Sequence, residues 1–266
     1  MIISEIENLK EILLKLGSVV VAYSGGQDST LLLKVAQDVL GPKCAAVIAS
    51  GPLFQPLETE AAEARAKNLG VRHKLVAFDV SEHPAFQANS TDRCYHCKHM
   101  MYGAFLKVAH TWNLKHLADG THVNDREDDR PGHRASRELG VRSPLKEAGL
   151  TKKQIVSASK ALGLDTWNKP SEACLATRIP FGTPVQTSTL ARIARCEALL
   201  HVLGIRQARV RYHHDTARIE ISPRDFDHIL DQRVRARLVS EFKSAGFRCV
   251  SLDLEGYRSG SLVPDA

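Results

Sequence analysis

The stretch "YSGGQDST", residues 23–30, lies between the β-branched run "SVVVAY" at 18–23 and "DSTLLLKVAQDVLG", a helical pattern closed by Gly41. Strand, glycine turn and helix in this order are typical of a phosphate-binding loop, because glycines let the backbone approach an anion and the helix start offers N–H groups. A P-loop would carry a lysine here, and this turn carries Asp28 instead. The turn therefore predicts a site for the β,γ-pyrophosphate of a nucleotide as a leaving group, with Asp28 and Mg²⁺ sharing the charge while a nucleophile attacks the α-phosphorus.

Strands and helices are expected to alternate along the first part of the chain. Strands are expected at 18–23, 44–50, 73–80 and 115–121, and helices at 28–41, 56–69, 97–111 and 151–163. The charged, turn-rich residues 122–146 are expected to form a loop. This alternation predicts an α/β fold with a parallel sheet covered on both faces and ligands at the carboxyl ends of the strands.

The pattern changes after "RIPFGTPVQTS" at 178–188. A helix is expected at 188–203, a hairpin at 208–221 around His214 and Asp215, mostly helix at 223–245 and a last strand at 248–257. We therefore expect two domains: a parallel-sheet nucleotide-binding domain over 1–182 and a smaller α+β domain over 183–266.

Composition and charge set limits on the class of protein. The chain has 266 residues, of which 43% are hydrophobic and 25% charged, as in an ordinary globular protein. The N-terminus reads as an amphipathic helix rather than a signal peptide, and no window of about 18 uncharged apolar residues is present, so we expect a cytosolic protein without a membrane span. The net charge of +6 favours anionic partners such as nucleotides, phosphorylated metabolites or RNA, or reflects only a solvated basic surface.

Two cysteine-containing segments carry candidate chemistry. Cys94 and Cys97 in "DRCYHCK" can reach one metal or act as a redox pair, although the spacing can also be incidental. Cys174 in "WNKPSEACLATRIPFGT" has Lys169 and Arg178 nearby, and a basic surrounding favours the thiolate as nucleophile or metal ligand. A lone cysteine is otherwise a small buried hydrophobe.

Three further cysteines fit the buried interpretation. Cys44 and Cys249 fall inside strand patterns and Cys196 falls on the helix at 188–203. In a cytosolic chain all six cysteines are expected to be reduced rather than joined in disulfides.

These motifs together carry a resemblance. "SGGQDS" resembles the loop of the PP-loop ATP pyrophosphatases, the adenine nucleotide alpha hydrolase-like superfamily, which adenylate a substrate oxygen and release pyrophosphate. With "RCYHCK", "RPG" at 130–132, "GVRSPL" at 140–145, "KPSEACLATRIPFGT" and "RVRYHHDTARIEI", the chain from 18 to 222 resembles the LarE family, ATP-dependent sulfurtransferases that mature the nickel-pincer cofactor of lactate racemase.

The resemblance implies a substrate and a set of site residues. ATP would adenylate the carboxylates of pyridinium-3,5-dicarboxylate mononucleotide, and sulfur would displace AMP in two rounds. By this resemblance Asp28 and the three candidate cysteines are catalytic, and the loop residues that bind ATP with Mg²⁺ are Ser24, Gly25, Gly26, Gln27, Asp28 and Ser29. The substrate-binding positions are Arg178, Glu197, Arg209, Arg211 and Asp125.

Two details qualify those positions. Arg209 and Arg211 alternate along a strand, so both face one way and suit a phosphate, whereas the competing interpretation is a solvated strand face. Where many relatives show Asn-x-Asp-Asp, this chain has "HVND" at 122–125, so only Asp125 keeps its place.

The resemblance leaves the sulfur source open. Some relatives sacrifice the last cysteine and are left with dehydroalanine. The three thiolates of Cys94, Cys97 and Cys174 resemble instead the [4Fe-4S] arrangement of cluster-dependent tRNA-thiolating enzymes, in which the open iron holds a hydrosulfide. We prefer the cluster on ligand count.

Two other functions compete with this one. A tRNA thiolase suits the basic charge, but the chain shows no added RNA-binding module and few aromatic residues to stack bases. A nucleotide sensor would use the loop without explaining the cysteines. We expect ATP and a small mononucleotide as partners, no nucleic acid and no membrane, and a homo-oligomeric assembly.

Overall fold

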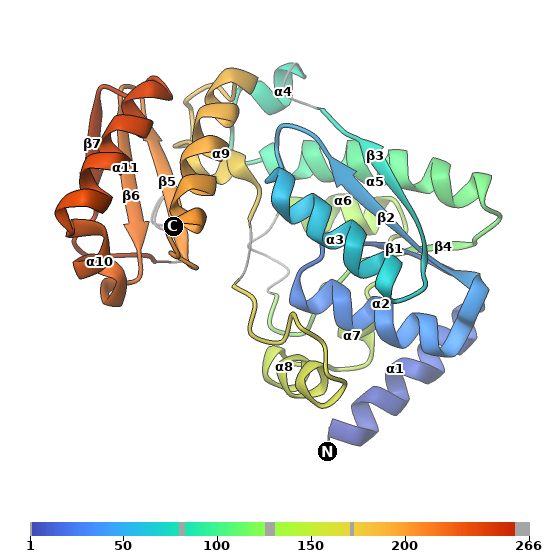
Figure 1. Ribbon diagram of the computed structural model, residues 1–266. Coiled ribbons are helices and arrows are strands. Elements are labelled where there is room, and N and C mark those ends of the chain that lie inside the picture. Colours follow the sequence, from blue (N-terminus) through green and yellow to red (C-terminus); the bar gives the residue numbers. More distant parts are fainter. Residues whose placement is uncertain (1, 80–82, 126–130, 171–172, 259–266) are drawn as a thin grey trace. The chain divides into compact units, whose positions relative to one another are not determined.

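The computed structural model describes residues 2–79, 83–125, 131–170 and 173–258 (Figure 1). The chain divides into two compact units. Unit 1 comprises Met1–Phe78 and Asp92–Glu172, and unit 2 comprises Asp79–Thr91 and Ala173–Ala266. None of the helices in the described part of the chain is long and apolar enough to cross a membrane.

Unit 1 is built on a parallel sheet. Its strands are β1 (Val19–Ala22), β2 (Cys44–Ser50), β3 (Arg72–Ala77) and β4 (His116–Ala118), in the order β3-β2-β1-β4. All three pairings are parallel, with Val19 opposite Cys44 in β2 and His116 in β4. The predicted parallel α/β fold is thereby confirmed.

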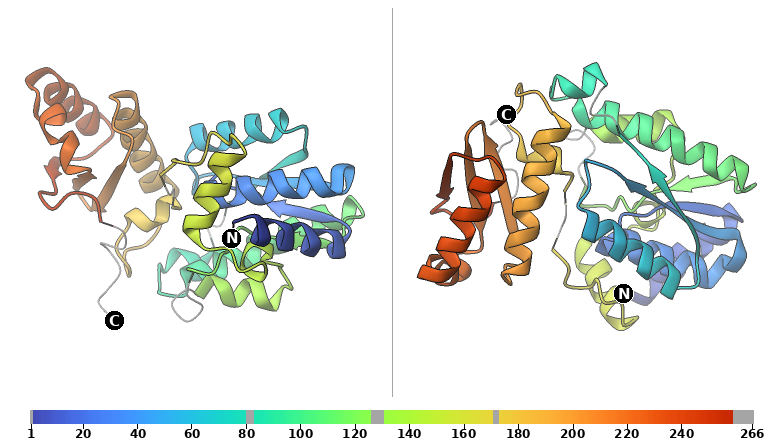
Figure 2. Two further views of the ribbon diagram at one scale, coloured as in Figure 1. Left: turned by 90° about the horizontal axis from the view of Figure 1, so that it is seen from below. Right: turned by 45° about the horizontal axis from the view of Figure 1, so that its top comes forward.

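Helices cover both faces of this sheet, as Figures 1 and 2 show. They are α1 (Ile2–Leu16), α2 (Gln27–Leu40), α3 (Pro56–Asn68), α5 (Arg93–Thr111), α6 (Pro131–Glu138), α7 (Pro144–Glu147) and α8 (Lys152–Ala161), with a short 3-10 turn η1 (Gly41–Lys43). Alternate strand residues point to opposite faces. Val19 and Val21 pack with α1, α2, α3, α7 and α8, while Val20 packs with α5.

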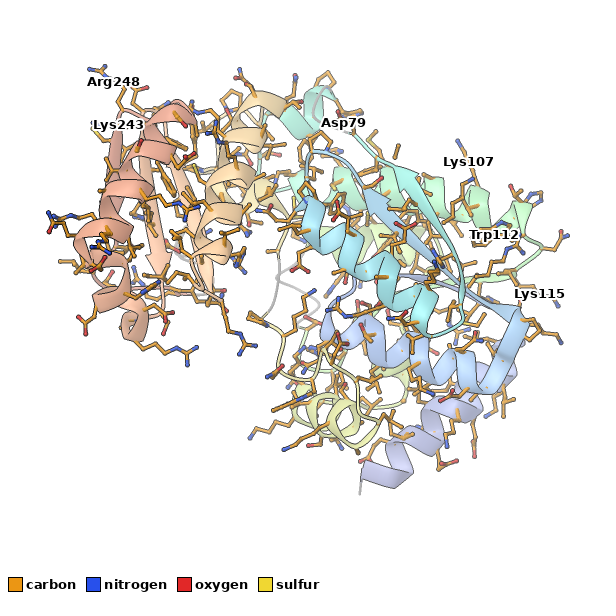
Figure 3. All side chains as sticks on the ribbon, viewed as in Figure 1. Asp79, Lys107, Trp112, Lys115, Lys243 and Arg248 are labelled. Carbon is orange, nitrogen blue, oxygen red and sulfur yellow. The ribbon has the colours of Figure 1, made fainter. Side chains whose placement is uncertain are left out.

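The two ends of the strands in this parallel sheet differ in their surroundings. In a parallel sheet all carboxyl ends lie at one edge, and ligands bind there. Figure 3 labels Trp112 and Lys115 at the opposite edge, where the chain enters β4. There Trp112 packs under the guanidinium of Arg72, 4.3 Å from its ring centroid, at the start of β3.

The expectation of a loop over 122–146 was wrong for part of that range. Residues 126–130 lie outside the described residues, but α6 and α7 are helical. α6 forms despite its charge because it packs against α5: Ala135 is fully buried, and a Cβ at Gly132 would come within 2.8 Å of the Lys98 side chain.

Unit 2 is a small α+β body. Its strands are β5 (Ala208–His213), β6 (Thr216–Ile221) and β7 (Cys249–Leu252), in the order β5-β6-β7. β5 and β6 form the expected hairpin, with His214 at the turn in the left-handed region (φ +53°), and β7 adds in parallel to β6. The other elements are α4 (Pro84–Gln87), η2 (Leu175–Arg178), α9 (Thr187–Val202), η3 (Pro223–Asp225), α10 (Phe226–Leu230) and α11 (Gln232–Ser244).

The boundary between the units differs from the predicted 182/183. Unit 2 resumes at Ala173 and also includes residues 79–91. Asn89 explains this membership, because its buried side-chain amide donates to the carbonyls of Pro180 (2.8 Å) and Thr183 (2.7 Å). A segment between two elements of unit 1 is thus held by the loop that leads into α9.

Candidate active site

The glycine turn lies where β1 ends and α2 begins. Gly25 has φ +69°, and a Cβ added there would come within 2.6 Å of the Ala62 Cβ on α3, so only glycine fits. Gly26 caps α2 without a side-chain hydrogen bond to the helix start. The first N–H groups of α2 therefore offer an anion the positive end of the helix, as the sequence predicted.

Hydroxyl groups hold the turn in shape. Ser24 Oγ accepts from Gly26 N (3.3 Å) and lies 3.1 Å from Ser29 Oγ, while Thr30 Oγ1 donates to Gly26 O (2.7 Å). Gly120, which follows β4, also lies close to the turn. A Cβ added at Gly120 would come within 3.0 Å of Ser29 N. The segment after β4 thus lies directly against the start of α2.

Two lysines lie at this turn: Lys152, which the sequence analysis did not single out, and Lys169, which it associated only with Cys174. Lys152 Nζ lies 2.5 Å from Asp28 Oδ1, and Lys169 Nζ donates to Gly25 O (3.2 Å) and pairs with Glu58. Lys152 is 124 residues from Asp28, and Lys169 is 144 residues from Gly25 and 111 from Glu58, so no local motif contains these pairs. The fold thus brings two ammonium groups to the turn, where the sequence motif itself contains no lysine.

The position of Lys152 is fixed by the start of α8. Thr151 and Gln154 form a reciprocal capping box, and Asn124 Oδ1 accepts from Lys152 N at 2.8 Å. Asp125, predicted to contact substrate, accepts from the N–H of His122 (3.1 Å) and shapes the turn that carries Asn124. The "HVND" segment therefore helps to position Lys152.

Cys94 and Cys97 lie on α5, which begins four residues earlier than expected. Residues three apart on a helix lie on the same side, so the two thiols can serve one metal. Cys94 is exposed and Cys97 is half-buried. Within the described ranges, no group of three or more His, Cys, Asp or Glu side chains is arranged to hold a metal ion.

Cys174 belongs to unit 2, where it caps η2. Its carbonyl oxygen accepts from Thr177 N (2.9 Å), Thr177 Oγ1 (2.7 Å) and Arg178 Nη1 (3.3 Å), while the residue itself is half-buried. The backbone of the predicted sulfur-bearing residue is thus firmly held.

Arg178 and Glu197 form a buried ion pair that supports this loop. Both are 0% exposed, and the guanidinium donates from Nε to Glu197 Oε1 (2.8 Å) and from Nη2 to Oε2 (3.0 Å). Arg178 also donates to Ala173 O (2.9 Å), and Glu197 accepts from Val210 N (2.9 Å). The pair therefore ties η2 to α9 and β5, which suits the positioning of Cys174.

The ionisation of Glu197 follows from this pairing. Burial alone would raise the pKa of Glu197, but the Arg178 guanidinium, the hydrogen bond from Val210 and the Arg209 charge outweigh it and hold that pKa below its ordinary value. Glu197 is therefore a carboxylate at neutral pH.

Arg209 and Arg211 lie side by side on β5, but the interpretation of a solvated strand face is wrong. They are 2% and 5% exposed. Arg211 pairs with Glu220 (2.7 Å) and donates to Thr177 O (2.9 Å), and the Arg209 guanidinium lies 5.3 Å from the Tyr257 ring centroid. Among the described residues of unit 2, the buried charged side chains are Arg178, Arg209, Arg211, Glu197 and Glu220.

The remaining cysteines divide into buried and exposed ones. Cys44 and Cys196 are buried as predicted, and burial raises the pKa of each thiol to about 12. Cys249 is exposed, which corrects the prediction of a buried residue: β7 pairs with β6 on one side, and its residues alternate between exposed and half-buried.

The parallel sheet, the glycine turn and the open start of α2 define an ATP-using enzyme of the PP-loop class. The family model for NAD synthase matches residues 4–101, which contain this turn. An uncharacterized protein from Synechocystis sp. is 39% identical over 98% of both chains, and another from Methanocaldococcus jannaschii is 31% identical over 95% of both.

A third relative has a named activity. The pyridinium-3,5-bisthiocarboxylic acid mononucleotide synthase of Lactiplantibacillus plantarum is 37% identical over 92% of this chain and 88% of its own length. The chain belongs to the LarE family, the family of that synthase. It is an enzyme of the ATP-dependent sulfurtransferase class.

Proposed function

We propose that the enzyme adenylates the carboxylates of pyridinium-3,5-dicarboxylate mononucleotide and converts them to thiocarboxylates. In each round a carboxylate oxygen attacks the α-phosphorus of ATP and pyrophosphate leaves. A sulfur nucleophile then attacks the acyl carbon, and AMP leaves with the carboxylate oxygen. The name of the Lactiplantibacillus relative supports this substrate.

The observation that supports this proposal most strongly is the geometry of the glycine turn. Its backbone and the α2 start suit a phosphate group, and Lys152 and Lys169 place positive charge beside it. A leaving pyrophosphate needs such stabilisation. In this proposal Ser24, Gly25, Gly26, Gln27 and Ser29 bind the nucleotide, and Asp28 shares Mg²⁺ with it.

The nucleotide products test this reaction. Purified enzyme with ATP, Mg²⁺ and the mononucleotide should form AMP and pyrophosphate in equal amounts, and Asp28→Ala should abolish both while leaving the unfolding temperature within a few degrees. Formation of ADP and orthophosphate without AMP would refute the proposed chemistry.

In unit 2 we assign the substrate phosphate to Arg209 and Arg211. The burial of both guanidiniums on one strand supports this assignment, because two such groups can hold one phosphate in fixed geometry. The Thr177 carbonyl, which accepts from Arg211, lies three residues after Cys174 and so links β5 to the sulfur-bearing loop. Arg178 and Glu197 act in this proposal by positioning Cys174. Replacement of Arg209 by Gln should raise KM for the mononucleotide at unchanged KM for ATP.

For the sulfur source we propose a [4Fe-4S] cluster bound by Cys94, Cys97 and Cys174. The shared face of Cys94 and Cys97 on α5 supports two of these ligands. When bound, such a cluster would hold a hydrosulfide for transfer. Anaerobically purified protein should then be brown with about four irons per chain, and Cys94→Ala should remove the colour.

In the competing route Cys174 donates its own sulfur and is consumed. Its Sγ would attack the acyl adenylate, and loss of the Cα proton with cleavage of the Cβ–S bond would leave dehydroalanine and the thiocarboxylate. Mass spectrometry after one turnover distinguishes the two: a Cys174 peptide lighter by one H₂S indicates the sacrificial route. We also expect a homo-oligomer, which light scattering would measure.

A further inference from the structure

The ammonium group of Lys169 contacts the backbone of the glycine turn. Its Nζ donates to Gly25 O (3.2 Å) and pairs with Glu58 on α3. The lysine side chain is only 13% exposed, so its ammonium is held between these two acceptors. Both contacts lie within unit 1.

The chain segment that carries this lysine is itself anchored to unit 1. Asp165 pairs with Arg65 on α3 (2.8 Å), and Trp167 O accepts from the side chain of Gln27 at the start of α2. These partners are 100 and 140 residues apart in the sequence. The ammonium therefore reaches the turn from a backbone that the fold holds in place.

The peptide between Gly25 and Gly26 has a different partner on each side. In a trans peptide the C=O and the N–H point in opposite directions. Gly25 O accepts from Lys169, while Gly26 N donates to Ser24 Oγ (3.3 Å), which lies 3.1 Å from Ser29 Oγ in the first turn of α2. The N–H is thus on the side of the α2 start, where it would favour a bound anion.

The opposite orientation of this peptide is open to two adjacent glycines. Gly25 has φ +69°, and Gly26 has φ −78° and ψ 170°. Rotation of the peptide by half a turn would bring φ of Gly26 to about +100°, in a region that essentially only glycine occupies. The carbonyl oxygen would then face the phosphate and repel it.

We propose that Lys169 is a positioning residue that holds the Gly25–Gly26 peptide in the orientation that binds phosphate. The ammonium stabilises this orientation because it donates to the carbonyl, and Glu58 keeps the ammonium in place. The apparent affinity for an anion is reduced in proportion to the fraction of enzyme in the competent orientation. This inference rests on the proposed function, which assigns the phosphates of ATP to this turn.

A double-mutant cycle with Gly26→Ala separates this role from direct contact with phosphate. Alanine disfavours the flipped peptide, so Lys169 should matter less in that background. Calorimetry with inorganic pyrophosphate and with ATP, each with Mg²⁺, measures wild type, Lys169→Met, Gly26→Ala and the double variant. Lys169→Met should weaken binding about tenfold in the wild-type background and less than about threefold in the Gly26→Ala background.

Two features of the variants make the cycle interpretable. Gly26→Ala brings its Cβ within 3.3 Å of Ser24 Oγ and has its own effect, so only the ratio between backgrounds is used. Methionine has nearly the length of lysine, and Glu58 is 35% exposed and can be hydrated, so Lys169→Met should keep its unfolding temperature within a few degrees. Lys160→Met is the matched control, since Lys160 Nζ lies 5.0 Å from the ring centroid of Trp167, in the same segment. It should bind both anions like wild type.

The remaining outcomes overturn the proposal or separate it from the proposed function. Equal losses in the two backgrounds would overturn it, because a direct phosphate contact does not depend on the residue at position 26. Unchanged affinity in Lys169→Met, or wild type that does not bind pyrophosphate, would also overturn it. Coupled losses, without AMP formation by wild type given the mononucleotide, would retain the role of Lys169 and refute the proposed function. AMP formation by wild type with equal losses in both backgrounds would refute only the role of Lys169.

Discussion

Lys152 Nζ and Asp28 Oδ1 lie 2.5 Å apart, although 124 residues separate them in the sequence. The pair joins the start of α8 to the start of α2, at the site of the expected leaving group. Asp28 is the residue proposed to share Mg²⁺, so bound nucleotide offers Lys152 phosphate oxygens as alternative partners. Because both side chains are partly exposed to solvent, breaking the ion pair to form this contact costs little free energy.

Lys152→Gln should therefore weaken Mg²⁺–ATP binding by about tenfold, the usual effect of losing one charge-assisted contact. Lys153→Gln is the matched control, because Lys153 is the adjacent residue on α8 and is exposed. Calorimetric titration with ATP and with pyrophosphate measures the effect. Equal affinities in the two variants would show that Lys152 does not bind phosphate.

Gly25→Ala should destabilise unit 1 and distort the turn. The left-handed backbone costs alanine about 1–2 kcal/mol, and the 2.6 Å contact with Ala62 Cβ adds an overpacking cost of about 1–3 kcal/mol. Gly17→Ala is the control, since Gly17 has a similar φ of +70° with no atom within 4 Å of the added Cβ. Denaturant unfolding of both variants checks this; equal losses would mean that the Ala62 contact relaxes without cost.

Arg178→Met should destabilise unit 2 by about 3–5 kcal/mol, because it leaves Glu197 buried without its partner. The double variant Arg178→Met with Glu197→Met should recover much of that loss, since both charges are then removed. Chemical unfolding with a probe in unit 2 measures both. A double variant no more stable than the single one would show that shape, rather than charge, sets the cost.

The pH dependence of the same pair has a defined sign. The pKa of Glu197 is lowered in the folded state from its ordinary 4.5, so its stabilisation is present above pH 4.5 and is lost as pH falls through the folded pKa. In Arg178→Met, burial dominates and raises that pKa, so the free energy of unfolding should increase as pH falls from 7. Unfolding curves between pH 4 and 7 check the reversal, and parallel slopes in the two proteins would contradict it.

Thiol reactivity should follow burial. With pKa values of about 12, Cys44 and Cys196 carry almost no thiolate at pH 8 and are shielded from reagent. Iodoacetamide should therefore modify Cys249 in the native protein and reach Cys44 and Cys196 only after denaturation. Peptide mass spectrometry reads each site, and rapid native labelling of Cys196 would indicate local opening of α9.

The order of elements was predictable because it depends on local patterns. The run at 44–50 is β2 residue for residue, and the glycine turn lies between a strand and a helix as expected. The hairpin at His214 followed from alternation and turn residues. Each of these depends on neighbours within a few positions. The high density of charged residues at 122–146 led to the prediction of a loop. Part of this range is helical instead, because α6 is stabilised by contact with α5, a distant segment of the chain.

The sequence by itself determined the phosphate turn, the family motifs and the two kinds of domain, since each is written in adjacent residues. Only the tertiary structure decided that Lys152 reaches Asp28 and that Asn89 ties 79–91 to unit 2. It also decided that Arg209 and Arg211 are buried. A strand with alternating charges has the same sequence whether its polar side meets water or buried partners. Burial and ion pairing depend on which distant segments pack together, and that is a property of the folded chain as a whole.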